Sequence, residues 1–225
     1  MNIEYTEVYG FNASMRGMRN PLDSWEKSDS KEAYEHYDEL IFYPSKEELS
    51  PFQQRYFYNN YNEEGFFLGE EDKKLAQKLT KSGSEHCKFL RQIHVWADLT
   101  LPRYIWSEFD TYKFNTKNSC STMHTAHRRF LKEDDFERPI QYSQLDYLNN
   151  LIEKKKNKEI TSDTFIGEFK SNLPESFLQK RTVDTSYAEL LNILHQRKNH
   201  RLSEWHKICD WILELPYFKE LTGVE

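Results

Sequence analysis

Glycine is scarce in this sequence: 7 of its 225 residues are Gly, and they do not cluster. The chain therefore contains neither the GxGxxG fingerprint of dinucleotide-binding folds nor a Walker loop, and the GxSxG and HExxH motifs are missing as well. Phosphate binding by a glycine-rich loop is excluded. If the protein binds a phosphate, Arg, Lys, Ser or Thr side chains or helix N-termini must hold it.

Cysteine and long apolar runs are also scarce. The three cysteines, Cys87, Cys120 and Cys209, are odd in number and far apart, so we expect no disulfide framework. No apolar run approaches the length that crosses a membrane, and the first residues have neither the basic nor the apolar region of a signal peptide. We therefore expect a soluble, cytoplasmic protein with no membrane partner.

Basic charge is not in excess either. The 31 basic and 37 acidic residues give a formal net charge of −6, which argues against general nucleic-acid binding but leaves room for a local basic pocket. Mean hydropathy is −0.89, while aromatic residues make up 15% of the chain. Because amphipathic aromatic side chains suit subunit interfaces as well as a core, we expect an oligomer.

The clearest pattern runs from residue 95 to residue 124. Apolar residues at every second position from Val95 to Leu101 predict a strand that ends at Pro102. Proline suits the first turn of a helix, and Ile105, Trp106 and later aromatic residues follow at helical spacing. Residues 111–124 have no hydrophobic period and are almost all polar. A polar loop after a strand–helix unit is a usual place for binding and catalysis, so this loop is the leading candidate site.

Hydrophobic periodicity elsewhere predicts further elements. We expect helices at residues 31–41, 46–60, 70–80, 146–156, 186–199 and 202–215. The helix at residues 70–80 should end at residues 82–83, and the Leu-Pro pair at residues 173–174 should interrupt the secondary structure. Residues 125–142 should form an exposed, charged connection. The sequence has no internal repeat. It predicts a single α+β domain, with residues 71–225 as its core and residues 1–70 as an aromatic, helical N-terminal extension.

Three polar groups each allow two interpretations. Arg16 and Arg19, which precede Asn20-Pro21, form either a turn with a cationic edge or a solvated loop. His86 is either a site residue or a structural histidine. Arg197 lies in a basic cluster at a helix end, near the buried face, and needs an anionic partner. That partner is either a protein carboxylate or a ligand phosphate.

One pattern is compatible with a metal. Cys120, His124 and His127 have the spacing C-x3-H-x2-H, and a thiolate with two imidazoles can bind zinc. A further cysteine or carboxylate at suitable spacing is missing, so we assign no metal ligands, and a metal-dependent enzyme stays a minor alternative.

Residues 111–124, TYKFNTKNSCSTMH, resemble the signature RHRxxSxNExSxRY of flavin-dependent thymidylate synthases, which also follows a strand ending in proline and a helix. In an alignment without gaps, Asn118 and Ser121 are identical to the signature. Lys113 replaces an Arg, and Thr116 replaces a Ser. The departures are Thr111, Tyr112, Ser119, Met123 and His124.

The resemblance extends, in the family's order, over roughly residues 84–205. His86 corresponds to a His-containing segment before the strand, and Glu108 to a Gln before the signature. Asn192 and Arg197 match an N-x-L-x-x-R pattern on a helix that follows Leu-Pro. Two further correspondences are Lys170, in place of an Arg just before Leu-Pro, and Ser24, in an early loop that contacts flavin in the family.

This resemblance implies an α+β fold with a mixed sheet and flanking helices, assembled as a homotetramer with flavin sites at subunit junctions. It implies a transferase of nucleotide biosynthesis that uses FAD, takes a carbon from methylenetetrahydrofolate and a hydride from NADPH, and methylates dUMP at C5 of the uracil ring.

The resemblance also implies roles for individual residues. The FAD contacts would be His86, Lys113, Thr116, Asn118, Asn192 and Ser24. The contacts to the uracil nucleotide would be Glu108, Ser119, Ser121, Lys170 and Arg197, of which Arg197 and Ser121 are the catalytic candidates.

Two departures remove positive charge, because Thr111 and Met123 stand where the family has arginines. Each lost charge-assisted contact costs about 1.5–3 kcal/mol, so the two together would weaken dUMP binding on the order of a hundredfold. Either other cations hold the phosphate, for which Arg128, Arg129 and Arg201 are candidates, or the substrate is not dUMP. The alternative function is a non-catalytic nucleotide-binding or interaction protein that keeps the fold.

Overall fold

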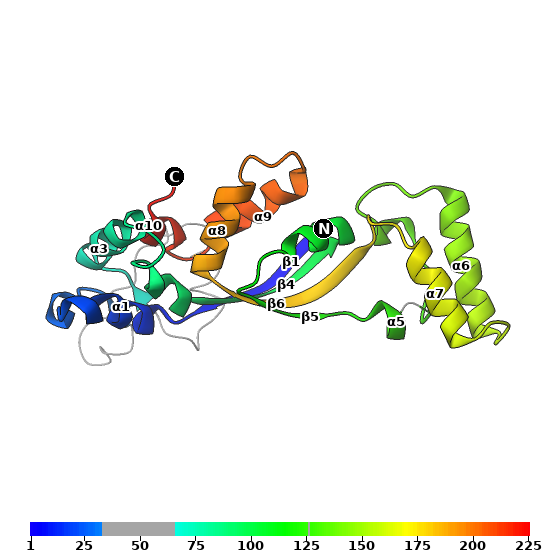
Figure 1. The fold of residues 1–225 in the computed structure, drawn as a ribbon, viewed down its shortest axis with the longest axis horizontal. Coiled ribbons are helices and arrows are strands. Elements are labelled where there is room, and N and C mark those ends of the chain that lie inside the picture. The colour runs from blue at the N-terminus through cyan, green and yellow to red at the C-terminus, as the bar shows by residue number, and fades with distance from the viewer. Residues whose placement is uncertain (33–65, 126) are drawn as a thin grey trace, which may run out of the picture. The chain divides into compact units, whose positions relative to one another are not determined.

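The computed structural model describes residues 1–32, 66–125 and 127–225 (Figure 1). These residues divide into two compact units. Unit 1 comprises Met1–Thr6 and Trp96–Asp184, and unit 2 comprises Glu7–Val95 and Thr185–Glu225. Three strands pass from one unit into the other, so neither unit is a continuous piece of the sequence.

The main sheet has four strands in the order β1-β4-β6-β5. Its strands are β1 (Asn2–Tyr9), β4 (His94–Pro102), β6 (Leu178–Ser186) and β5 (Thr116–Ser119). Strand β5 pairs antiparallel with β6, with Thr116 opposite Asp184 and Ser119 opposite Arg181, and the two run side by side in Figure 1. A second sheet pairs β2 (Lys31–Glu32) with β3 (Phe66–Phe67).

The predicted strand–helix unit is confirmed. Strand β4 buries Val95, Leu99 and Leu101 on one face and ends at Pro102, and helix α4 (Arg103–Phe109) begins at once. Alternation of this kind places one side of a strand in the core. Trp106 of α4 is buried, and its indole N–H donates to the carbonyl of Gln179, 2.8 Å away.

The polar segment after α4 is more ordered than predicted. It contains strand β5 and the short helix α5 (Thr122–Thr125), whereas the sequence predicts a loop throughout. The prediction was wrong here because β5 has no buried face of its own: three of its four residues are exposed. The strand forms through backbone pairing with β6, which no hydrophobic period can reveal.

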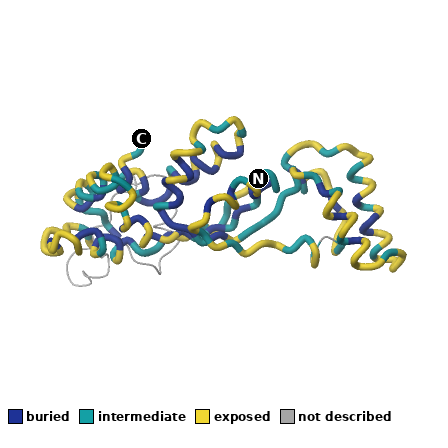
Figure 2. The backbone as a smooth tube through the Cα atoms, in the orientation of Figure 1, coloured by how far each residue is buried: buried dark blue, intermediate teal, exposed yellow. Residues whose placement is uncertain are grey.

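Unit 1 also contains a helical part that follows β5. Helix α6 (Tyr142–Lys156) and helix α7 (Ser162–Asn172) pack around Leu148, Ile152, Phe165 and Phe169, and buried positions alternate with exposed ones along both helices (Figure 2). The predicted helix at residues 146–156 is confirmed with an earlier start, and α7 was not predicted.

The connection at residues 125–142 was predicted to be charged and exposed. The structure corrects this: Leu131 and Phe136 are buried in the same cluster as the two helices, on either side of the 3-10 helix η6 (Glu133–Asp135). Because charged residues surround these two apolar positions, no hydrophobic period in the sequence indicates that they are buried.

Unit 2 is mainly helical. Its helices are α1 (Phe11–Arg19), α3 (Glu70–Lys81), α8 (Tyr187–Arg197), α9 (Ser203–Leu213) and α10 (Phe218–Thr222), with 3-10 helices η1 (Asn20–Leu22), η2 (Trp25–Lys27) and η5 (Lys88–Gln92). Phe11 stacks on Phe66 and contacts the edges of Tyr187 and Tyr217. This aromatic cluster accounts for part of the high aromatic content.

The predicted helices at residues 70–80, 186–199 and 202–215 are confirmed as α3, α8 and α9, and α3 stops at Ser82 as expected. Helices α1 and α10 were not predicted. The predicted helices at residues 31–41 and 46–60 lie outside the described residues, except that Lys31 and Glu32 form β2. Among the described residues, none of the helices combines the length and the apolar character needed to span a membrane.

Candidate functional site

Within unit 1, two cations of the paired strands β5 and β6 converge on one carboxylate. Both Asp110 oxygens accept hydrogen bonds from Arg181 Nη1, at 3.0 and 3.1 Å, and Lys117 Nζ lies 3.1 Å from Asp110 Oδ1. The Arg181 guanidinium also lies 4.3 Å from the centre of the Trp106 ring. The cluster therefore joins β5 and β6 to the end of α4.

Lys180, the neighbouring cation on β6, is also paired. Its ammonium lies 3.0 Å from Asp98 and 3.2 Å from Glu4. A hydrogen bond from Thr182, followed in importance by one from Lys180, lowers the pKa of Asp98 below its usual range. No sequence pattern indicates Lys117, Lys180 or Arg181 as site residues, because their carboxylate partners lie on other elements.

Three predicted ligand-binding residues lie on β5. Thr116 and Asn118 are two residues apart and therefore share a face, opposite the face of Lys117, and both are exposed. Ser119 is exposed at the end of the strand, opposite Arg181 in the register. The strand thus brings Thr116 and Asn118 together as a pair of accessible polar side chains.

The other predicted residues of unit 1 are spread around this strand. Lys113 is exposed and donates to the carbonyl of Asp110, while Glu108 is half-buried near the end of α4. Ser121 is half-buried, and its carbonyl accepts a 2.6 Å hydrogen bond from the hydroxyl of Thr125. Lys170 is exposed on α7, in the helical part of the unit, and not on β5.

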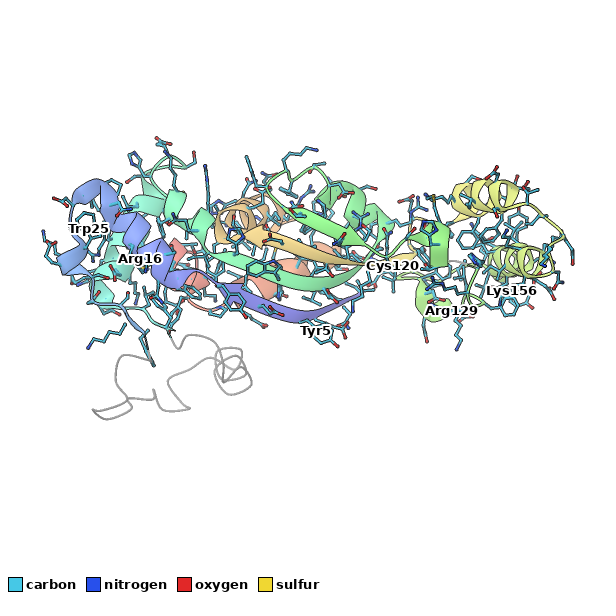
Figure 3. All side chains as sticks on the ribbon, turned by 90° about the horizontal axis from the view of Figure 1, so that it is seen from below. Tyr5, Arg16, Trp25, Cys120, Arg129 and Lys156 are labelled. Atoms are coloured by element: carbon cyan, nitrogen blue, oxygen red, sulfur yellow. The ribbon has the colours of Figure 1, made fainter. Side chains whose placement is uncertain are left out.

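In unit 2, Ser24 lies beside a buried ion pair. Arg19, 3% exposed, donates from Nε to Asp72 of α3, and its Nη1 donates to the carbonyl of Ser24 at 3.2 Å. Neither interpretation of Arg16 and Arg19, a turn with a cationic edge or a solvated loop, is therefore confirmed: both residues lie on helix α1, and Arg19 is buried. Figure 3 shows Arg16 on α1 and Trp25 on the segment that follows it.

Asp72 also fixes the segment after Ser24. The hydroxyls of Ser28 and Ser30 donate to Asp72 Oδ2 at 2.7 and 2.6 Å. Burial alone would raise the pKa of the Asp72 carboxyl, but the hydrogen bonds from Ser30, Ser28 and Arg19 outweigh burial and hold the pKa below its usual value. Asp72 is therefore ionised at neutral pH.

The Ser24 hydroxyl is buried and has no hydrogen-bond partner in the part of the chain that the structure describes. Ser24 is 6% exposed, and its Oγ makes no hydrogen bond to any described residue. Buried polar groups are nearly always hydrogen-bonded, so an unpartnered hydroxyl calls for an explanation, of which a bound ligand is one.

The remaining predicted residues of unit 2 lie on α8 and before η5. Asn192 is exposed, and its amide contacts Glu189 and Gln196 on the same helix. Arg197 is half-buried at the end of α8, with its guanidinium 4.6 Å from the centre of the Trp205 ring. His86 is exposed beside Glu85.

The described residues do not support the alternative metal site. They contain no group of three or more His, Cys, Asp and Glu side chains placed to hold a metal ion. Cys120 Sγ instead lies 3.7 Å from the hydroxyl of Thr125. Burial raises the pKa of the Cys87 thiol, and burial followed by the charge of Asp210 raises the pKa of Cys209 to about 11. Both shifts lower the fraction of reactive thiolate.

No family model matches this sequence, and no curated protein matches it either. Solved structures do match. One is the flavin-dependent thymidylate synthase ThyX from Helicobacter pylori complexed with FAD and dUMP, with 16% sequence identity, a TM-score of 0.65, and coverage of 99% of this chain and 97% of that chain. A second structure of Helicobacter pylori ThyX with FAD and dUMP has 14% identity, a TM-score of 0.67 and the same coverage.

These likenesses show the fold. Both units fall within one match, so the chain has a flavin-dependent thymidylate synthase-like α+β fold, as the resemblance of residues 111–124 led us to expect.

Proposed function

We propose that this protein is a flavin-dependent thymidylate synthase-like enzyme that uses FAD in the reductive methylation, or a related C5 modification, of a uracil deoxynucleotide such as dUMP. The observation that carries the proposal is the fold likeness, which spans 99% of the chain, to proteins solved with FAD and dUMP. The order and spacing of the signature-like segment support it independently.

The residues present fit a flavin. The Ser24 hydroxyl is buried and has no partner among the described residues, as expected for a group that hydrogen-bonds a ligand. Thr116 and Asn118 offer exposed polar side chains on one face of β5, and Lys113 offers an ammonium that can neutralise a phosphate. Asn192 and His86 are the remaining proposed FAD contacts. When bound, FAD would supply the redox step that a reductive methylation requires.

The proposed nucleotide contacts are Glu108, Ser119, Ser121, Lys170 and Arg197. Among them Arg197 is the strongest candidate for a catalytic role, since its guanidinium is held on the Trp205 ring and can form paired hydrogen bonds to a phosphate or carboxylate. A fixed cation stabilises negative charge that develops on a substrate. Ser121 would donate or accept a hydrogen bond at the same nucleotide.

The phosphate needs cations that replace the arginines missing at Thr111 and Met123. Arg129 is a poor candidate, because both of its terminal nitrogens are paired with Asp135. Arg128 and Arg201 are exposed and remain candidates. NADPH and methylenetetrahydrofolate are the proposed co-substrates.

A non-catalytic relative that binds a nucleotide or a partner is the second candidate function. The observation that favours it is the pairing of the cations on β5 and β6: Lys117 and Arg181 share Asp110, and Lys180 is held by Asp98 and Glu4. Carboxylates thus neutralise positive charge that an anionic substrate would otherwise meet.

We also propose that the chain forms a homotetramer in the cytoplasm, with residues 71–225 as the flavin-binding core and residues 1–70 as an extension of the same domain. Strand β1 of this extension joins the main sheet beside β4.

Anaerobic reduction of the flavin distinguishes the two candidate functions. The protein is loaded with FAD, mixed with NADPH, and the flavin absorption is followed with and without dUMP and methylenetetrahydrofolate. If the protein is the proposed enzyme, we expect NADPH to bleach the flavin absorption and a methylated nucleotide to form in the complete mixture. FAD binding without reduction, or reduction without any nucleotide product, would favour the non-catalytic relative.

A further inference from the structure

One carboxylate of unit 2 organises the whole segment that carries Ser24. Asp72 of α3 is fully buried and receives hydrogen bonds from Arg19, from the hydroxyl of Ser28 and from both the hydroxyl and the backbone N–H of Ser30. The segment is thereby attached to α3 through three residues, one that precedes Ser24 and two that follow it.

Arg19 connects Asp72 directly to the backbone of Ser24. Its planar guanidinium binds Asp72 through Nε and the Ser24 carbonyl through Nη1, so a single rigid group links the two residues. The Ser24 carbonyl also accepts a 3.1 Å hydrogen bond from the backbone N–H of Lys27. The carbonyl is therefore fixed from two directions.

The backbone around Ser24 needs such fixation. Asp23 has a φ of 45°, in the left-handed region, and Ser24 has φ −131° and ψ 36°, outside the helical and extended regions. Residues in sparsely populated conformations persist when surrounding contacts over-determine them, and they concentrate at ligand-binding sites.

The Ser24 side chain is attached to this fixed backbone. The hydroxyl is buried and unpartnered among the described residues, although Arg19, Ser28 and Ser30 bind the segment around it to Asp72. A segment that merely needed to be stable would satisfy this hydroxyl internally.

We propose that Asp72 is a positioning residue for the flavin: acting through Arg19, it holds the Ser24 backbone so that the Ser24 hydroxyl points at the cofactor. The inference rests on the proposed function, since it takes the flavin as the partner of this hydroxyl. Asp72 itself does not touch the ligand.

A double-mutant cycle on FAD affinity tests the role. FAD is titrated, by quenching of its fluorescence, into the full-length wild type, Asp72→Asn, Ser24→Ala and the double variant. We expect each single variant to weaken FAD binding by roughly fivefold, the effect of about one hydrogen bond, and the double variant to bind no more weakly than Ser24→Ala. If Asp72 acts only through the Ser24 hydroxyl, its replacement cannot weaken FAD binding further once that hydroxyl has been removed.

Gln77→Ala is the matched control. Gln77 lies on the same helix α3 as Asp72, but its side chain donates to the carbonyl of Glu220 and not to the Ser24 segment. This variant removes a comparable tertiary contact and should leave FAD affinity unchanged. A second variant, Arg19→Lys, keeps the ion pair with Asp72 but loses the planar link to the Ser24 carbonyl, so it carries the test if Asp72→Asn does not fold.

The outcomes separate the two proposals. If the wild type binds FAD but Asp72→Asn and Arg19→Lys bind it equally well, or if the effects of Asp72→Asn and Ser24→Ala multiply, Asp72 has only a structural role and the inference is overturned. If the wild type takes up no FAD, the proposed function fails, and the positioning role fails with it.

Discussion

At the scale of single residues, the ion pair between Arg19 and Asp72 has a large energetic consequence. Both side chains are almost fully buried, and removing one partner of a buried pair leaves the other charge unpaired, at a cost of about 3–5 kcal/mol. We therefore expect removal of either partner to lower the free energy of unfolding measurably.

The first prediction concerns the pH dependence of this pair. The pKa of Asp72 is lowered below its ordinary value of 3.8 in the folded state, so its contribution to stability is complete above about pH 4 and is lost as the pH falls through the folded pKa. We expect the unfolding free energy of the wild type to fall below pH 4 more steeply than that of Asp72→Asn. Urea unfolding of both proteins at a series of pH values measures the difference. Parallel curves below pH 4 would contradict the account.

The second prediction concerns Arg197. Replacing it by Ala removes the cation held on the Trp205 ring, and loss of one charge-assisted contact to a nucleotide should weaken dUMP binding about tenfold or more. A calorimetric dUMP titration of wild type and Arg197→Ala measures this effect. Trp205→Phe, which keeps an aromatic ring beneath the guanidinium, serves as the control and should bind nearly as well as the wild type. Unchanged affinity in Arg197→Ala would make the residue purely structural.

At this scale, order along the sequence pointed to individual residues but not to the ion pairs that form between distant positions. Ser24 and Asn192 were selected by their order along the chain, and the structure gives Ser24 an unpartnered hydroxyl. The link between Arg181 and Asp110 was missed because 71 residues separate them. Nothing local in the sequence indicates that these two positions meet across a strand pair.

At the scale of elements, the strand pair β5–β6 is the part that the sequence predicted least well. Backbone pairing defines β5, and the Arg181–Asp110–Lys117 cluster fastens it to α4. A hydrophobic pattern cannot predict such a strand, because three of the four residues of β5 are exposed. By contrast, β4, α3, α8 and α9 bury one regular face each, and their periods predicted them.

The missed helices have physical reasons of their own. Helix α10 has only five residues, too few for a period to be recognised. Helix α7 has Gly167 in its interior, a residue that lowers helix propensity, and α1 contains Gly17. Tertiary packing of Phe165 and Phe169 compensates for that propensity in α7.

The third prediction tests the fastening of β5. Arg181→Ala removes both hydrogen bonds to Asp110 and the stacking on Trp106, so the pairing of β5 should open more readily. We expect the backbone amides of residues 116–119 to exchange with deuterium about tenfold faster or more. Lys180→Ala, on the same strand but paired with Asp98 and Glu4, is the control and should leave these amides unchanged. Equal exchange in both variants would mean that backbone pairing alone holds the strand.

At the scale of the whole molecule, fold and site differ in how far the sequence reveals them. The strand ending at Pro102, the helix after it and the spacing of the polar segment pointed to the fold that the likeness to ThyX structures then showed, at only 14–16% identity. A fold tolerates exchange of side chains that keep the hydrophobic pattern. The proposed site is less tolerant, because Thr111 and Met123 stand where the signature that the chain resembles has arginines. Which cations would replace those arginines depends on residues that are distant in the sequence.

The measurement that tests the central claim most directly is the visible absorption spectrum of the purified protein, before and after incubation with FAD and removal of unbound cofactor. A flavin-dependent enzyme predicts a flavin spectrum that remains with the protein, at about one FAD per chain, with bands shifted from those of free FAD. A protein that emerges colourless from incubation with excess FAD, while folded by circular dichroism, would contradict the account.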